Sequence, residues 1–394
     1  MANIAIRLNQ KAALAVRKGH PWVFSDSILK LSKEGTHGDT AIAFDQSGKH
    51  WLGAGLYDPE SPVRVRILTI KRNDPPVGKE LFRTLLKRAL ERRLDHVPPE
   101  TDAWRIINGE SDSFSGVVAD KYADHAVLKI YSAAWIPHVQ ALRELLVEEV
   151  PGVKETVLRF SRELRKYPEC VEEGNSEPVT FLENGIRFQA DLLHGQKTGF
   201  FLDQRDNRAE VKTLSKGKKV LNVFSFSGGF SLSAAKGGAE KVVSVDADGH
   251  ALEACDLHFK MNSDCPEIAA CSHEELKGDA FELMRGLIEK KERFDIVIVD
   301  PPSFAKSKAE VSTALNTYSR LAALAVKLCV PKGTLVFASC SSRVYADELF
   351  ERVKTAASAA GRPIREWKRT AHAFDHPALF AESSYLKCMY AEVR

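Results

Sequence analysis

No stretch of this sequence approaches the roughly 20 consecutive apolar residues that a helix needs to cross a bilayer, so we expect no contact with a membrane. Charged residues interrupt the N-terminal stretch MANIAIRLNQKAALAVRKGH before the apolar segment of a secretion signal can form. Internal repeats and low-complexity tracts are also missing. These absences predict a cytoplasmic globular protein.

Cysteine is present, but the common patterns of metal and disulfide sites are not. The seven cysteines form no CxxC pair, and no paired histidines stand at metal-ligand spacing. We therefore predict no metal and no disulfide framework. A reduced cysteine is by default a small buried apolar group, so a catalytic role for one of them requires further evidence.

Length and charge leave the class of function open. With 394 residues, 44% of them hydrophobic and 28% charged, the chain is an ordinary globular protein of more than one domain. The net charge of +3 is only mildly basic and does not by itself indicate a nucleic-acid binder. Basic residues crowd two segments, 83–93 and 159–166, where they either neutralise phosphates or form a solvated face.

The first 70 residues carry short β-type runs separated by turns. The runs Ala41–Phe44, Trp51–Tyr57 and Val63–Ile70 are typical of a small β-barrel. The segment 71–80 contains charges, two prolines and a glycine, as expected of a linker. The pattern predicts a first domain over residues 1–72.

A second domain is predicted over residues 76–190. It combines helices at Leu81–Arg93 and Ile136–Glu149 with several strands, and the step Asn184-Gly185 is a strong hairpin signal. The remaining residues, 191–394, alternate apolar strands with helices. This alternation predicts an α/β domain in which helices cover both faces of a mostly parallel sheet of seven strands.

The segment VLNVFSFSGGFSLSAA (220–235) places an apolar strand before a Ser/Gly turn and a helix of small residues. Glycine allows a ligand to approach the backbone, and a helix N-terminus offers unpaired N–H groups. We expect the turn to hold a cofactor through Phe224, Ser225, Phe226, Ser227, Gly228 and Gly229.

Acidic residues follow three further strands. Asp246 ends the second strand, where a carboxylate can accept both ribose hydroxyls of an adenosine; capping the next helix is the alternative. Asp279 follows the third strand and is placed to bond an adenine amino group, and Asp300 ends the fourth. This series indicates S-adenosylmethionine as the cofactor of a methyltransferase.

The motif Asp-Pro-Pro-Ser-Phe at 300–304 is foreign to NAD-type dehydrogenases, which share the first two elements of the series. It resembles the motif of methyltransferases that act on planar bases. Pro301 and Pro302 hold the backbone rigid, and Phe304 can pack on a flat substrate.

Cys340 lies just beyond the fifth strand, GTLVFAS, at the end of the sheet where ligands bind in open α/β folds. Carbon 5 of a pyrimidine is too weak a nucleophile to take a methyl group directly. A thiolate that adds to C6 makes C5 enamine-like, and loss of the C5 proton after methyl transfer releases the enzyme. The alternative for Cys340 is an inert small residue at a strand end.

Six motifs together resemble the bacterial 23S ribosomal RNA 5-methylcytosine methyltransferases of the RlmI type, over nearly the whole chain. They are KGHPWVFSDSI (18–28), INGESDSFSGVVADKY (107–122), HGQKTGFFLDQRDNR (194–208), VLNVFSFSGGF (220–230), FDIVIVDPPSF (294–304) and ASCS (338–341). The resemblance implies an N-terminal RNA-binding PUA domain, a small central α/β domain and a C-terminal class I, Rossmann-like methyltransferase domain. It also implies 23S ribosomal RNA as the substrate and a possible homodimer.

The same resemblance implies that Cys340 is the nucleophile. Relatives with two cysteines carry the second one beside Asp-Pro-Pro, where this chain has Ser303, so Asp300 is the candidate base by position. The segment 194–208 resembles a motif that precedes the first strand. From it we expect Gln204 and Arg205 to contact the cofactor, and Lys197 and Arg208 to contact the substrate together with Pro301, Pro302 and Phe304. For each of the two arginines, a surface ion pair with Asp203 or Asp206 is the alternative.

Two other functions stay open at this point. A purine N-methyltransferase would use the same Asp-Pro-Pro motif, because the nitrogen of its substrate attacks without help from a thiol. A non-catalytic RNA-binding assembly factor would retain a degenerate cofactor pocket.

Overall fold

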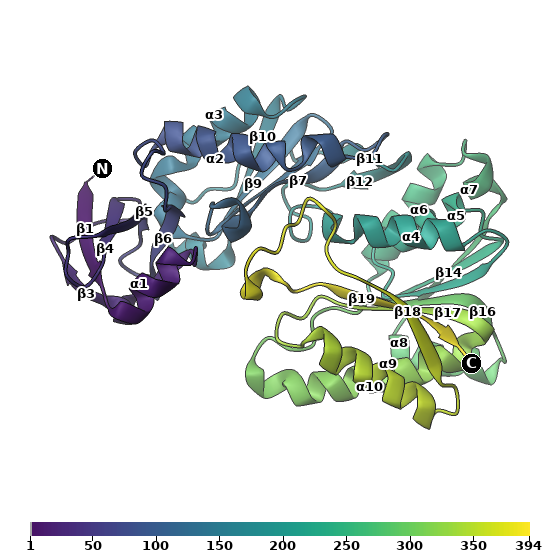
Figure 1. The fold of residues 1–394 in the computed structure, drawn as a ribbon. Helices are drawn as coiled ribbons and strands as arrows, with labels where there is room; N and C mark the ends of the chain where they lie inside the picture. Colours follow the sequence, from purple (N-terminus) through teal and green to yellow (C-terminus); the bar gives the residue numbers. More distant parts are fainter. Residues whose placement is uncertain (1) are drawn as a thin grey trace. The chain divides into compact units, whose positions relative to one another are not determined.

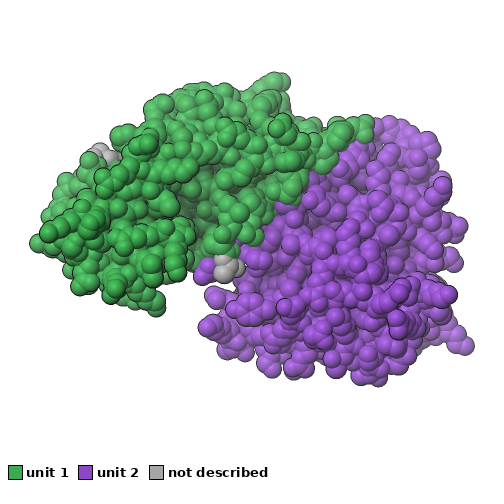
Figure 2. Space-filling view, in the orientation of Figure 1, with its two compact units in different colours: residues 1–182, 190–202, 374–380 green, residues 183–189, 203–373, 381–394 purple. Residues whose placement is uncertain are grey.

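The computed structural model describes residues 2–394, apart from the side chain of Ala381, and it divides into two compact units (Figures 1 and 2). The first unit contains the residues up to Leu182 together with Ala190–Leu202 and Phe374–Phe380. The second contains Glu183–Gln189, Asp203–Ala373 and Ala381–Arg394.

The first unit begins with a six-stranded sheet in the order β2-β6-β5-β4-β1-β3. Ile4, Ile6 and Leu8 alternate with exposed residues along β1, so one face of the strand enters the core. The three predicted strands are confirmed to within one residue at their ends, whereas β1 and the helix after it were not predicted. The elements are β1 (Asn3–Leu8), α1 (Gln10–Arg17), β2 (Trp22–Phe24), β3 (Ile28–Leu31), β4 (Thr40–Phe44), β5 (Trp51–Tyr57) and β6 (Val63–Thr69).

A four-stranded sheet in the order β10-β9-β8-β7 follows in the same unit, and two helices share its apolar cluster. The helix predicted at 81–93 spans Lys79–Glu91, and its apolar residues Leu85 and Leu86 are buried. The elements are α2 (Lys79–Glu91), β7 (Ala103–Asn108), β8 (Val117–Tyr122), β9 (His125–Ile130), α3 (Val139–Glu149) and β10 (Glu155–Phe160).

The predicted hairpin is formed by β11 (Val179–Glu183) and β12 (Ile186–Ala190). Its two turn residues, Asn184 and Gly185, both have positive φ, at 51° and 75°. A two-residue turn needs this left-handed backbone to match the twist of its strands, and Asn-Gly adopts it at low cost.

The second unit is built on a seven-stranded sheet in the order β15-β14-β13-β16-β17-β19-β18. Strands β15, β14, β13, β16 and β17 pair in parallel, and β19 and β18 add antiparallel pairs at the far edge. This is the mostly parallel, doubly wound sheet that the sequence predicts. The strands are β13 (Lys219–Val223), β14 (Lys241–Asp246), β15 (Ser272–Lys277), β16 (Phe294–Val299), β17 (Cys329–Ser339), β18 (Ile364–Thr370) and β19 (Lys387–Val393).

Helices cover both faces of this sheet (Figure 1). Leu221 and Val223 of β13 belong to the apolar cluster that includes α8, α9 and α10, whereas Val220 belongs to the cluster of α4, α5 and α7. Alternate residues of the strand thus pack against the helices on opposite faces of the sheet. The helices are α4 (Arg205–Leu214), α5 (Gly229–Lys236), α6 (Gly249–Met261), α7 (Pro266–Ala270), α8 (Ala280–Glu289), α9 (Val311–Leu328) and α10 (Ala346–Ala359). Within residues 2–394, none of the helices is both long enough and apolar enough to span a membrane.

Candidate active site

The candidate site lies at the carboxyl ends of β13, β14, β16 and β17. Val223 is level with Val245 on one side and with Val299 on the other, and Val299 is level with Phe337. The residues that follow these positions are therefore brought to one edge of the sheet. The turn after β13, Asp246, Asp300 and Cys340 all lie along this edge, as the strand pattern predicts.

The turn after β13 has a strained backbone. Phe224 and Phe226 have positive φ, at 63° and 47°, which is costly for residues with a bulky side chain. Hydrogen bonds to the next strand stabilise this conformation: the Ser225 amide donates to the Val245 carbonyl at 2.9 Å, and the Phe226 amide donates to Asp246 Oδ2 at 2.8 Å. Strain held in this way is typical of a backbone shaped to receive a ligand.

Polar atoms in the turn and at the end of β13 lack partners. Among the described residues, Asn222 Oδ1, Ser225 Oγ and Ser227 Oγ are buried without a hydrogen bond. Buried polar atoms are normally paired, so this group fits a polar ligand bound against the turn. Gly228 then caps α5 with φ of 81°, and a Cβ there would lie 2.3 Å from Cys255 Sγ.

His258 holds the turn from behind. Its Nδ1 lies 2.9 Å from the Ser227 carbonyl, and its Nε2 accepts from the Gln189 amide at 2.9 Å. Burial lowers the pKa of His258, which favours the neutral ring that this pair of contacts requires. Sequence reasoning did not identify this residue, since a lone histidine in a helix gives no signal.

Two of the three acids expected on the cofactor, Asp246 and Asp279, have different surroundings. Asp246 does not cap the following helix, because Asp248 does so; the Asp246 carboxylate instead accepts from the amides of Phe226 and Asp248. Asp279 caps α8 by accepting from the Glu282 amide at 3.0 Å. Asp279 therefore has a structural role that was not predicted, and its contact with adenine stays a prediction.

Asp300 is joined to the segment before the first strand. Gln204 Nε2 donates to Asp300 Oδ2 at 2.9 Å, and Asn207 Nδ2 donates to Gln204 Oε1 at 2.6 Å. Gln204 and Asn207 are both buried, so this amide chain holds the carboxylate in one orientation. The structure thus brings Gln204 to the same site as Asp300, as the motif at 194–208 suggests.

The other cations of that motif are placed differently. The buried Arg208 guanidinium forms two 2.6 Å hydrogen bonds with the buried Glu183 carboxylate, which favours a structural role over the predicted substrate contact. Arg205 is fully buried, and its Nε lies 3.5 Å from Asp206 Oδ1. Lys197 belongs to the first unit, where its ammonium lies 4.4 Å from the centre of the Phe201 ring.

Cys340 is half-buried. The residues on either side of it are held by hydrogen bonds that involve hydroxyl groups. Tyr318 Oη lies 2.8 Å from Ser339 Oγ, which also accepts from the Ser341 amide at 3.2 Å. The Phe304 ring packs on Tyr318, with the two ring centres 5.1 Å apart. Pro301 is buried and Pro302 is exposed. The backbone on both sides of Cys340 is therefore fixed, and Phe304 lies beside this site as predicted.

Tyr318 and Lys387 are site residues that sequence reasoning missed. Burial raises the pKa of Tyr318 to about 12, and the nearby Cys340 and Asp300 contribute to the increase. Burial lowers the pKa of Lys387 to about 8, and Cys340 opposes this decrease. A lysine within the apolar run YLKCMYAEV was a usable signal, because lysine is rarely buried without a partner.

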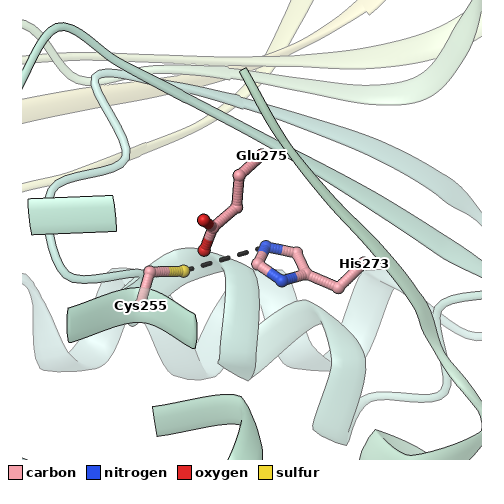
Figure 3. Close-up of side chains that lie close together, drawn as sticks. All are labelled: Cys255, His273 and Glu275. Carbon is pink, nitrogen blue, oxygen red and sulfur yellow. Dashed lines mark hydrogen bonds between the residues drawn. The ribbon is translucent and has the colours of Figure 1, made fainter. Parts of the chain in front are cut away.

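A second titratable cluster lies between α6 and β15 (Figure 3). The side chains of Cys255, His273 and Glu275 point toward one another, and His273 Nε2 is 2.9 Å from Ser244 Oγ and 3.8 Å from Cys255 Sγ. Burial raises the pKa of the Cys255 thiol and the Glu275 carboxyl and lowers that of His273 to about 4. Burial thus favours the neutral form of all three groups, as expected of a hydrogen-bonded packing cluster.

Ion pairs account for the basic segment at 83–93. Arg83 and Lys87 pair with glutamates of α3, Arg88 with Asp74, and Arg92 and Arg93 with Asp112. This segment therefore does not offer a row of unpaired cations for phosphates. Lys87 and Arg92 are exposed, as expected of a solvated face, whereas Arg93 is buried.

The segment at 159–166 is partly neutralised, because Arg165 lies 3.7 Å from Glu172, Lys166 lies 2.7 Å from Glu60, and Arg159 is buried. Burial lowers the pKa of Lys129, and the nearby cations Arg159 and Arg165 lower it further. Glu172 and Asp120 oppose this shift, so carboxylates lie within electrostatic range of the same cations.

The comparisons with known proteins identify the family and two domains of the chain. Residues 155–368 match the family model described as S-adenosylmethionine-dependent methyltransferase, and residues 6–70 match a PUA-like domain. The chain is 40% identical to a ribosomal RNA large subunit methyltransferase of Deinococcus radiodurans, in a match that covers 99% of this chain and 97% of that protein. It is 34% identical to the ribosomal RNA large subunit methyltransferase I of Aliivibrio fischeri (strain ES114), in a match that covers 98% of each.

A solved structure supports the fold. A methyltransferase crystallised in complex with SAH superposes over 100% of both chains with a TM-score of 0.82 at 21% sequence identity. The α/β architecture predicted from the sequence is therefore confirmed.

Proposed function

The chain belongs to the ribosomal RNA large subunit methyltransferase I family, an S-adenosylmethionine-dependent family, and from this premise we propose that it methylates carbon 5 of a cytosine in 23S ribosomal RNA. The observation that carries the proposal is the position of Cys340 at the edge of the sheet where Asp300 and the cofactor turn also lie. A nucleophilic thiol is needed for C5 methylation and not for methylation of a purine nitrogen.

The residues of the turn fit S-adenosylmethionine. The unpaired buried oxygens of Asn222, Ser225 and Ser227 provide acceptors, and the Asp246 carboxylate is held in place for two ribose hydroxyls. Arg205 and Asp279 are proposed as further contacts, to the amino-acid end and to the adenine. When bound, the cofactor supplies an electrophilic methyl group on a sulfonium.

Cys340 carries out the first chemical step. Its thiolate attacks C6 of the cytosine, a carbon–sulfur bond forms, and the electron pair of the C5–C6 double bond makes C5 nucleophilic enough to take the methyl group. Removal of the proton at C5 then restores the double bond and expels the thiolate. Ser339 and Ser341 keep the backbone around the sulfur in place through the Tyr318 hydroxyl and the Ala305 carbonyl.

Asp300 is the proposed acceptor of the C5 proton. One of its oxygens is held by Gln204, an uncharged donor that orients the carboxylate without adding a positive charge. Phe304, packed on Tyr318, would cover one face of the flat base, and Pro301 and Pro302 keep the connecting backbone rigid.

The substrate assignment extends to the first unit. A PUA-like domain is proposed over residues 1–72, a central domain over 76–190 and the methyltransferase domain over 191–394. The match of residues 6–70 to a PUA-like domain supports this division of the chain, and Lys197 is proposed as a contact to the RNA.

Methylation of unmodified ribosomal RNA by the full-length protein tests the proposal. We expect 5-methylcytosine as the product in nucleoside mass spectrometry, loss of turnover in Cys340→Ala, and unchanged calorimetric binding of S-adenosylmethionine. Cys271→Ala is the matched control, because that thiol is also half-buried and precedes β15, at the far edge of the sheet. A methylated purine, or turnover retained by Cys340→Ala, would overturn the mechanism, and failure to bind the cofactor would indicate a non-catalytic factor.

RNA that contains 5-fluorocytidine gives a second readout. Fluorine at C5 cannot leave as a proton does, so the adduct with Cys340 should accumulate as a covalent complex on a denaturing gel. Cys340→Ala should form none, and Cys271→Ala should form as much as the unmodified protein.

A further inference from the structure

Lys387 is the first residue of β19, a strand that is buried over most of its length. It is 6% exposed, and the three residues that follow it, Cys388, Met389 and Tyr390, are fully buried. Strand β19 runs antiparallel to β17, and Lys387 lies directly opposite Ser339, next to Cys340. Burial of an ammonium is costly unless something compensates its charge.

Backbone carbonyls, not carboxylates, hold this ammonium. Lys387 Nζ donates a short hydrogen bond to the Ser341 carbonyl and a 3.0 Å hydrogen bond to the Tyr385 carbonyl. Throughout the described part of the chain, no carboxylate forms an ion pair with it, in contrast to Lys368 on the neighbouring strand, which pairs with Glu210 at 2.6 Å. The ammonium is thus fixed beside Cys340 without a carboxylate to compensate its charge.

We infer that Lys387 is a positioning residue for the reaction: its fixed ammonium beside Cys340 favours the thiolate over the thiol and so supplies the nucleophile near neutral pH. This inference rests on the proposed role of Cys340. Burial lowers the pKa of Lys387 to about 8, and the negative charge of an ionised Cys340 opposes this decrease. The interaction is mutual. Because an ionised Cys340 favours the protonated form of Lys387, the protonated Lys387 favours the ionised form of Cys340 to the same extent.

Asp300 and Tyr318 are the other titratable groups that face Cys340, and a cation is needed to offset the negative charge of Asp300. Cys340 and Asp300 both raise the pKa of Tyr318, so the three groups lie within electrostatic range of one another. Tyr318 stays neutral, since its pKa is raised to about 12, whereas an ionised Asp300 disfavours a second negative charge on Cys340. Lys387, on the strand that pairs with β17 from the other side, is the group that offsets Asp300.

Two readouts on the full-length protein separate this role from a purely structural one. The first is the rate at which iodoacetamide alkylates Cys340, followed against pH by peptide mass spectrometry, which reports the thiolate fraction without requiring methylation. In Lys387→Met, we expect the alkylation curve to move to higher pH by about one pH unit or more, because removal of an adjacent opposite charge has an effect of this size. Lys387→Arg, which keeps the charge, should stay close to the unmodified protein.

The second readout is the pH dependence of kcat for methyl transfer. Lys387→Met should lose about tenfold in kcat at pH 7 for each pH unit by which the alkylation curve moves, and it should recover most of the loss near pH 9.5, with binding of S-adenosylmethionine unchanged. Lys368→Met is the control and should leave both profiles unaltered, since its charge is paired with Glu210. A rate that falls equally at every pH, or an alkylation curve that does not move, would overturn the inference.

The two experiments also distinguish failure of this inference from failure of the proposed function. If Cys340→Ala retains methylation, the proposed nucleophile is wrong, whereas the alkylation curve still decides whether Lys387 acts on the thiol. A loss of thermal stability common to Lys387→Met and Lys387→Arg, with no difference in their pH profiles, would assign the lysine to packing and overturn the inference.

Discussion

Gly228 is the position at which the structure makes the sharpest prediction about the cofactor turn. Its φ of 81° is left-handed, and an added Cβ would lie 2.3 Å from Cys255 Sγ, 3.1 Å from Cys255 Cβ and 3.2 Å from Leu232 Cδ1. Gly228→Ala therefore carries two costs. The left-handed backbone costs about 1–2 kcal/mol for a residue with a Cβ, and insertion of a methyl group into a packed site costs about 1–3 kcal/mol.

Gly238 is a matched control for the first of these costs. Its φ is 84°, but the nearest atoms to an added Cβ are 3.8 Å away in Lys216, so Gly238→Ala has the backbone cost without the clash. We expect Gly238→Ala to lower the free energy of unfolding by about 1–2 kcal/mol. Gly228→Ala should lower it by about 2–5 kcal/mol, the sum of both costs.

The double variant Gly228→Ala/Cys255→Ala isolates the clash. Removal of the sulfur eliminates the 2.3 Å contact, while the backbone strain remains. The free energy of unfolding of the double variant should therefore exceed the value expected from adding the two single effects. We expect a difference of about 1–2 kcal/mol, within the range measured for residues in contact. Chemical denaturation of the four variants measures these differences. Strictly additive effects, or equal losses in Gly228→Ala and Gly238→Ala, would refute the close approach of the turn to α6.

Three further predictions concern charge in the second unit. Arg208→Met leaves the buried Glu183 carboxylate unpaired and should cost about 3–5 kcal/mol in unfolding free energy, whereas Arg208→Met/Glu183→Leu should recover most of it; an equally unstable double variant in urea would contradict this. His273 has a folded-state pKa of about 4, below its usual 6.5, so its contribution to stability is present above pH 6.5 and lost as pH falls toward 4. His273→Phe should flatten the decline in thermal stability over that window, and an unchanged slope would assign the decline to other groups. Asp246→Asn keeps an acceptor for the Phe226 amide but loses the carboxylate for the ribose, so calorimetry should show binding of S-adenosylmethionine weakened about tenfold or more with little change in melting temperature; unchanged affinity would remove Asp246 from the cofactor site.

Much of the fold is encoded locally, and for that reason it was predictable. Asn184-Gly185 marks a hairpin because those residues accept positive φ, and the apolar runs that end in Asp246 and Asp300 are buried strands because both of their faces are covered. The predictions were weakest where a residue serves a local role as well. Asp279 has the spacing of a cofactor ligand, but it also caps α8, a role that only the helix geometry reveals.

The arginines show a second limit of prediction from the sequence. Arg208 has a spacing that suits an anionic ligand, yet its partner Glu183 lies 25 residues earlier in the chain. The basic segment at 83–93 has the composition of a phosphate-binding surface, but α3 and the loops around it provide a carboxylate for each cation. Sequence spacing does not reveal partners that the fold brings from distant segments.

The sequence by itself determined the alternation of strands and helices in the second unit from β13 onward, the turn at 224–229 and the position of Cys340 past a strand end, because periodicity and turn chemistry act over a few residues. Only the tertiary structure decided what surrounds that thiol. Gln204 meets Asp300 across 96 residues, and Lys387 reaches the carbonyl of Ser341, next to Cys340, because β19 pairs antiparallel with β17. Such contacts depend on sheet order and register, which the whole chain sets when its core is packed.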